Sequence, residues 1–135
     1  MIYFETGDIA RVLDSSEMKA SLYQALDRIG PKKKVLLIPP DFTRFHSHAG
    51  ELTRYAWEYY GDAVTDILPA LGTHFPMTSD QISKMFGDIP QDLFREHDWR
   101  NDIVTLGEVP SEFIKEVSGG LVDYSWPVQV NRILV

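Results

Sequence analysis

Two short polar clusters in this sequence combine residue types that can carry out acid–base chemistry on a small anion. The first is Asp41-Phe42-Thr43-Arg44, and the second, further along the chain, is Gly72-Thr73-His74. An arginine offers a planar set of donors that suits a carboxylate or a phosphate, and a histidine exchanges protons near neutral pH. Joined by an aspartate in one site, they could clamp an anion and transfer a proton.

Each cluster directly follows an apolar run that has the character of a buried strand. The first run is 35–38, closed by Pro39-Pro40, and the second is 63–71. Residues 52–59 lie between them and carry apolar side chains at helical spacing. Strand, loop, helix and strand form a βαβ unit, whose ligand crevice lies beyond the carboxyl ends of its strands. We therefore predict an α/β fold, a mostly parallel Rossmann-like sheet with flanking helices, with both clusters at its ligand site.

Capping residues and periodicity predict the remaining elements. Asp14 with Glu17, and Thr78 with Gln81, have the spacing of capping boxes that begin helices. Including the helix of residues 52–59, the predicted helices end at Gly30, Gly61 and Gly87. Further strands are predicted at 2–5, 103–106 and 128–135, and a short helical turn at 90–94.

The composition is that of an ordinary globular chain that forms one domain over residues 1–135. It is 44% hydrophobic and 24% charged, with a formal net charge of −7. The basic cluster Lys32-Lys33-Lys34 stands at the start of a predicted strand, so no extended phosphate-binding surface is indicated. Nucleic acid is therefore not an expected partner.

The sequence also gives expectations about where the protein is located in the cell and whether the chain is part of a longer one. The absence of cysteine excludes thiolate metal sites and is compatible with a cytoplasmic location. No signal peptide is visible, and no apolar run approaches the roughly 20 residues of a membrane span, so no membrane partner is expected. Since the sequence ends inside an apolar strand pattern, we expect an N-terminal part that packs against a missing C-terminal portion.

The main candidate residues also have purely structural explanations. Asp41 can simply cap the following turn, and Arg44 can pair with Asp41 or another acid. His74 can be a structural histidine, although its place at a strand end suits a general acid or base. The sequence by itself leaves both explanations open for all three residues.

The other histidines carry weaker signals. His46 and His48 have the spacing of a two-histidine metal half-site, but solvated loop histidines explain this isolated pattern better. His97 is expected at the surface or at a hinge, and no chemistry is assigned to it.

Four ordered signals give the chain a family resemblance. It resembles the N-terminal part of nickel-dependent lactate racemase and its homologues, which are racemases and epimerases of 2-hydroxy acids. The matching segments are Asp41-Phe42-Thr43-Arg44, Gly72-Thr73-His74, His97-Asp98 followed by Leu106-Gly107, and Val130-Asn131-Arg132. The chain departs from the family at Phe45 and Phe75, where proline and arginine are common, which suits a subgroup with a larger substrate such as a sugar acid.

The resemblance implies a reaction and a cofactor. The cofactor would be a nickel-pincer nucleotide that takes up hydride from C2 of a 2-hydroxy acid and returns it to the opposite face. His74 would be the base for the hydroxyl proton and Arg44 the carboxylate anchor. Contacts to the cofactor would come from Asp41, Thr43, Gly72 and Thr73. The family's second catalytic histidine, covalently bound lysine and nickel ligand lie downstream of the matched region, so this chain alone is expected to be inactive.

Two other functions stay open. One is a hydrolase whose metal ion is held by His46, His48 and His74. The other is a standalone anion- or nucleotide-binding module that uses Arg44 and backbone N–H groups without chemistry.

Overall fold

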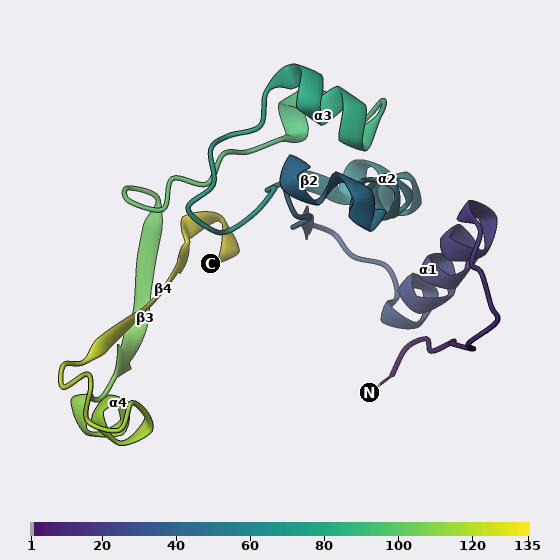
Figure 1. Cartoon of the computed structure of the whole chain (residues 1–135). Helices are drawn as coiled ribbons and strands as arrows, with labels where there is room; N and C mark the ends of the chain where they lie inside the picture. The colour runs from purple at the N-terminus through teal and green to yellow at the C-terminus, as the bar shows by residue number, and fades with distance from the viewer. Residues whose placement is uncertain (1) are drawn as a thin grey trace. The chain divides into compact units, whose positions relative to one another are not determined.

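Three α-helices and a parallel pair of strands build the first of the two units into which the chain divides. The computed structural model describes residues 2–135. The first unit contains the residues up to Ala70 together with His74–Glu96, and the second contains Leu71–Thr73 and His97–Val135. Figure 1 shows the helices and strands along the chain.

The first helix, α1 (Ser15–Ile29), begins and ends where its capping residues predict. The Asp14 side chain accepts from the backbone N–H of Glu17, and the Glu17 side chain accepts from the backbone N–H of Asp14. These reciprocal bonds satisfy two of the N–H groups that a helix start leaves without partners. Gly30 ends the helix with a φ of 77°, a conformation that favours glycine.

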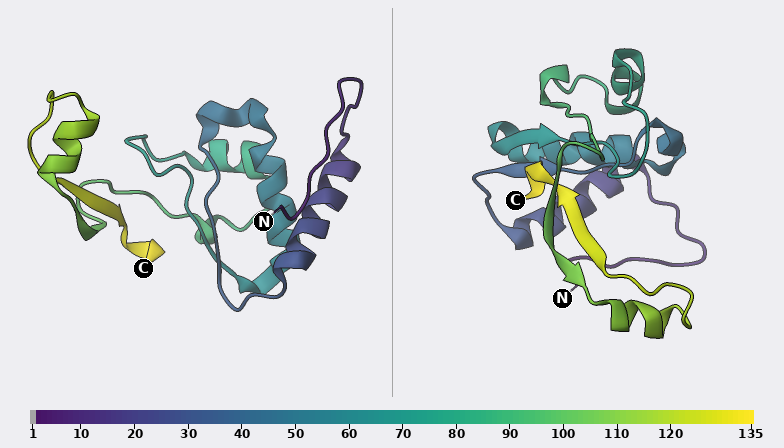
Figure 2. Two further views of the ribbon diagram at one scale, coloured as in Figure 1. Left: turned by 90° about the horizontal axis from the view of Figure 1, so that it is seen from below. Right: turned by 90° about the vertical axis from the view of Figure 1, so that its left-hand side faces the viewer.

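Helix α1 packs against α2 (Ala49–Tyr60) through polar and aromatic contacts (Figure 2). The Tyr59 hydroxyl donates to Asp27 at 2.6 Å, and the Tyr23 and Tyr59 rings meet edge to face. Lys19 pairs with Glu58 at 2.6 Å. These contacts attach α1 to the element that follows the first polar cluster.

Strands β1 (Val35–Leu37) and β2 (Val64–Ile67) pair in parallel, with α2 between them in sequence. This is the βαβ order that the sequence predicts. Backbone hydrogen bonds continue beyond the strands, from the N–H of Leu68 to the carbonyl of Leu37 and from the N–H of Ala70 to the carbonyl of Pro39. The two chain segments therefore stay together past the carboxyl ends of both strands.

Helix α3 (Ser79–Phe86) closes the core of this unit. Its capping box of Thr78 and Gln81 and its end at Gly87 are as predicted. Phe86, Ile67 and Leu68 are the largest fully buried side chains. At the contact between α2 and α3, a Cβ on Gly50 would collide with the carbonyl oxygen of Met85. Only glycine therefore permits this close approach of the two helices.

The second unit is an antiparallel pair of strands, β3 (Ile103–Val109) and β4 (Trp126–Asn131), joined through α4 (Ser111–Val117). Figure 2 shows the two strands side by side, with α4 at the end where they are connected. Short 3₁₀ turns complete the described chain. They are η1 (Phe42–Ser47), η2 (Gly61–Ala63), η3 (Gln91–Leu93) and η4 (Arg132–Leu134).

Several sequence predictions need correction. Residues 2–5 form no strand, because nothing in the described chain pairs with them. The strand predicted at 128–135 begins earlier and gives way to η4, and the strand predicted at 63–71 is only four residues long. Helix α4 was not predicted. Residues 2–135 thus form a mixed α/β structure with one parallel and one antiparallel strand pair.

No helix within residues 2–135 combines the length and the apolar character that a membrane crossing requires.

Candidate active site

Asp41 lies at the point where the chain leaves β1 and turns into η1. Its backbone is extended, and its Oδ1 accepts from the backbone N–H of Thr43 at 3.0 Å and from the Thr43 hydroxyl at 2.5 Å. An aspartate at the start of a helical turn satisfies N–H groups that would otherwise lack partners. The capping role expected of Asp41 is therefore present, but it uses only one carboxylate oxygen.

The other carboxylate oxygen of Asp41 contacts His74. Asp41 Oδ2 lies 2.5 Å from His74 Nδ1. Asp41 is buried, with 6% of its surface exposed, whereas 46% of the His74 side chain is exposed. The pair thus joins a buried carboxylate to a solvent-accessible imidazole.

The surroundings of Asp41 favour its charged form. Burial alone would raise its pKa, but the hydrogen bonds from the hydroxyl and the backbone of Thr43, together with the neighbouring His74, outweigh burial and lower the pKa of Asp41. Asp41 is therefore a carboxylate at neutral pH. A carboxylate that accepts from Nδ1–H fixes the histidine tautomer in which Nε2 is free to accept a proton.

Arg44 lies in the same turn and has an exposed side chain. Its backbone N–H donates to the carbonyl of Asp41 at 3.0 Å, and its Nη1 donates to the Thr43 hydroxyl at 3.5 Å. No carboxylate of residues 2–135 forms an ion pair with it. The guanidinium therefore keeps its charge and most of its donors for another anion.

A left-handed residue helps to join the two loops. Ala70 has a φ of 58°, which is uncommon for a residue with a side chain, and its N–H bonds to the carbonyl of Pro39 at 2.8 Å. This bond ties the segment before His74 to the segment before Asp41. The sequence gives no signal for it, because alanine has no preference for the left-handed region.

The structure brings together four of the six predicted site residues. Asp41, Thr43, Arg44 and His74 all belong to the first unit and form one chain of contacts. Gly72 and Thr73 are exposed and belong to the second unit.

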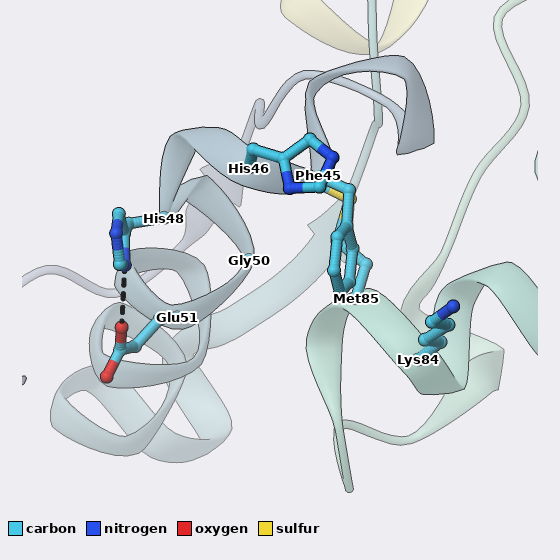
Figure 3. A pocket seen from close by; sticks show the side chains of 7 residues that line it. All are labelled: Phe45, His46, His48, Gly50, Glu51, Lys84 and Met85. Atoms are coloured by element: carbon cyan, nitrogen blue, oxygen red, sulfur yellow. Dashed lines mark hydrogen bonds and ion pairs between the residues drawn. The ribbon is translucent and has the colours of Figure 1, made fainter.

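His46 and His48 line a pocket of the first unit, and none of Asp41, Thr43, Arg44 and His74 is among its lining residues. This pocket has a volume of about 360 Å³, and its lining includes Phe45, Lys84 and Met85 (Figure 3). His48 contacts Glu51 at 3.2 Å, and Figure 3 shows His46 beside Phe45. No three His, Asp or Glu side chains of residues 2–135 are grouped closely enough to hold a metal ion. The donor set of the alternative metal hydrolase is therefore not assembled.

Comparison with known proteins gives one informative likeness. No protein-family model matches the sequence, and no curated protein matches it. A crystal structure of a Thermotoga maritima protein, solved by a structural genomics consortium, is similar with a TM-score of 0.73 and 28% sequence identity. The match covers 90% of this chain and 31% of the Thermotoga chain, so this chain spans about a third of that protein's length.

Proposed function

We propose that this chain is the N-terminal catalytic portion of a lactate racemase-like enzyme that inverts C2 of a 2-hydroxy acid. The observation that carries the proposal is the contact between Asp41 and His74, since an imidazole oriented by a carboxylate can act as a general base. Arg44, exposed and without an ionic partner among residues 2–135, supplies the cation that such a substrate needs.

We assign each of the three residues a role in this reaction. The substrate carboxylate binds the guanidinium of Arg44, and the substrate hydroxyl faces Nε2 of His74. His74 Nε2 would hold the hydroxyl proton while the nucleotide, kept in place by residues outside this chain, supplied the hydride acceptor for C2, and would then return the proton. Asp41 keeps Nδ1–H in place and stabilises the imidazolium in between. Because both oxygens of Asp41 are already engaged, we assign it to orienting His74 rather than to holding a cofactor.

The residues described do not by themselves fit a nickel centre. No group of three metal-binding side chains exists among residues 2–135. We therefore derive no step through the nickel-pincer nucleotide and propose that residues outside this chain hold it, while Thr43, Gly72 and Thr73 supply only peripheral contacts.

The proposal includes the remainder of a larger cytoplasmic protein. A two-stranded pair is small for an independent sheet, so we propose that β1 and β2 belong to a larger, Rossmann-like parallel sheet. The second unit exposes large apolar side chains that suit a covering domain. They include Leu106, Phe113, Val117, Leu121 and Trp126. The Thermotoga chain, of which 31% is matched, has room for such a domain.

The experiment that tests the function uses the full-length protein purified with its natural cofactor. D-lactate, and a sugar acid such as D-gluconate, are incubated with it in D₂O, and the products are analysed by chiral chromatography and mass spectrometry. Inversion without deuterium at C2 is expected, because hydride that stays on the enzyme does not exchange with solvent. The proposal would be contradicted if neither acid is inverted, or if the product carries deuterium at C2.

Variants of His74 and Arg44 separate the role of the base from that of the carboxylate anchor. His74→Asn should lower kcat about 10²- to 10⁴-fold with a smaller change in KM, since it removes the base. Arg44→Gln should chiefly raise KM. Lys33→Gln is the control, because it removes one positive charge from an exposed residue outside the site. An anion-binding module would instead bind the acid in a way that depends on Arg44 but not on His74, with no turnover.

A further inference from the structure

A second pocket lies within the second unit. It has a volume of about 230 Å³. Its apolar lining includes Trp99, Ile103, Val130 and Leu134, and its polar lining consists of His97, Gln129 and Asn131. Apolar walls with a few convergent polar groups are typical of sites for small molecules.

The orientation of Asn131 determines which tautomer of His97 is present. Asn131 is almost fully buried, with 2% of its surface exposed, and its Oδ1 accepts from the backbone N–H of Ile133 at 2.9 Å. A backbone N–H can only donate, so the amide cannot be flipped, and Nδ2 must face His97. Nδ2 then donates to His97 Nδ1 at 2.8 Å. Neutral His97 therefore carries its proton on Nε2.

That proton has no acceptor in the described chain. Residues 2–135 provide no hydrogen bond to Nε2 of His97. Gln129 contributes the complementary group, because its Nε2 donates to the Thr105 hydroxyl at 3.2 Å and its carbonyl oxygen is left as an acceptor. The pocket thus offers one neutral donor and one neutral acceptor.

Size and charge define what can bind. The volume lies below the roughly 300–1,000 Å³ of pockets for drug-sized ligands, so a single small ring fits. No Lys, Arg, Asp or Glu side chain lines the pocket, so a charged ligand would lose hydration without gaining a partner. We propose that this pocket binds a small uncharged ring that carries an amide or lactam group, with its carbonyl at His97 and its N–H at Gln129.

The test uses benzamide as the probe and benzoate as its charged counterpart, added to the full 135-residue chain labelled with ¹⁵N. Benzamide should shift the Trp99 indole resonance and the backbone resonances of residues 129–131, with a Kd of the order of 1 mM for so small a ligand. Benzoate should bind at least about tenfold more weakly. Equal binding of both probes, or no shift at these residues, would overturn the proposal.

Variants distinguish recognition from a structural role. Gln129→Met keeps the shape of the side chain but removes the acceptor, and should lower the affinity for benzamide about tenfold. Thr105→Val removes the same Gln129–Thr105 hydrogen bond without touching the pocket lining, and should leave benzamide affinity within about twofold. If Thr105→Val weakens binding as much as Gln129→Met does, Gln129 affects binding only indirectly, through its hydrogen bond to Thr105. The proposed contact between Gln129 and the ligand would then be wrong.

Discussion

Asp41 Oδ2 and His74 Nδ1 lie 2.5 Å apart, which joins the loop after β1 to the segment after β2. Asp41→Asn removes the charge and places an amide where an acceptor is needed. Because Asp41 is buried, we expect the free energy of unfolding to fall by about 1–3 kcal/mol. Chemical denaturation at pH 7 measures this. Asp62→Asn, at an exposed aspartate in η2, is the matched control and should change stability little. Equal effects of the two substitutions would show that the contact between Asp41 and His74 does not stabilise the fold.

Thr43 is one of the groups that lower the pKa of Asp41. Its hydroxyl donates to Asp41 Oδ1 at 2.5 Å, and this bond helps to lower the pKa of Asp41. Thr43→Val should therefore raise the pKa of Asp41, whereas Thr43→Ser keeps the hydroxyl and should preserve it. Carbon-13 NMR of the labelled aspartate carboxyl groups follows the titration. The same Asp41 pKa in both variants would show that the hydroxyl does not matter.

The ionisation of Glu51 should make the stability of the fold depend on pH. The Ser15 hydroxyl, the Tyr55 hydroxyl and then His48 lower the pKa of Glu51 to about 2, against the opposing effect of burial. A carboxyl group with a lowered folded-state pKa stabilises the fold above its unfolded pKa, near 4.5, and loses this contribution as the pH falls toward 2.

Glu51→Gln should accordingly be less stable than the parent at pH 6, and the difference should shrink between pH 4.5 and pH 2. Urea denaturation across this range gives the measurement. Glu96→Gln, at an exposed residue of the same unit, is the control and should change stability at pH 6 little. A difference for Glu51→Gln that stays constant with pH would contradict the assigned pKa.

Gly50 is required by packing rather than by backbone conformation. A Cβ there would collide with the carbonyl oxygen of Met85 and lie 2.9 Å from Met85 Cγ. Alanine normally stabilises a helix relative to glycine, but here the collision should dominate, and Gly50→Ala should cost about 1–3 kcal/mol. Gly7→Ala, where nothing lies within 4 Å of the added Cβ, should be close to neutral. Thermal denaturation of both variants decides whether α2 and α3 approach as closely as described.

The sequence by itself determined the local elements of the first unit. The capping boxes at Asp14 and Thr78, and the helix ends at Gly30, Gly61 and Gly87, lie where predicted. These features depend on residues within about one helical turn of each other, so they can be recognised from spacing alone. The parallel pairing of β1 and β2 was also predictable, because a helix between two apolar runs favours it.

Only the tertiary structure decided which candidate side chains meet. Asp41 contacts His74, and a hydrogen bond from Ala70 to Pro39 also links the two segments, with Ala70 in a backbone conformation that its side chain does not favour. His97 likewise acquires a defined tautomer from Asn131, 34 positions along the chain. Such contacts depend on where separate segments are brought together by packing, and residue types and spacing do not contain that information.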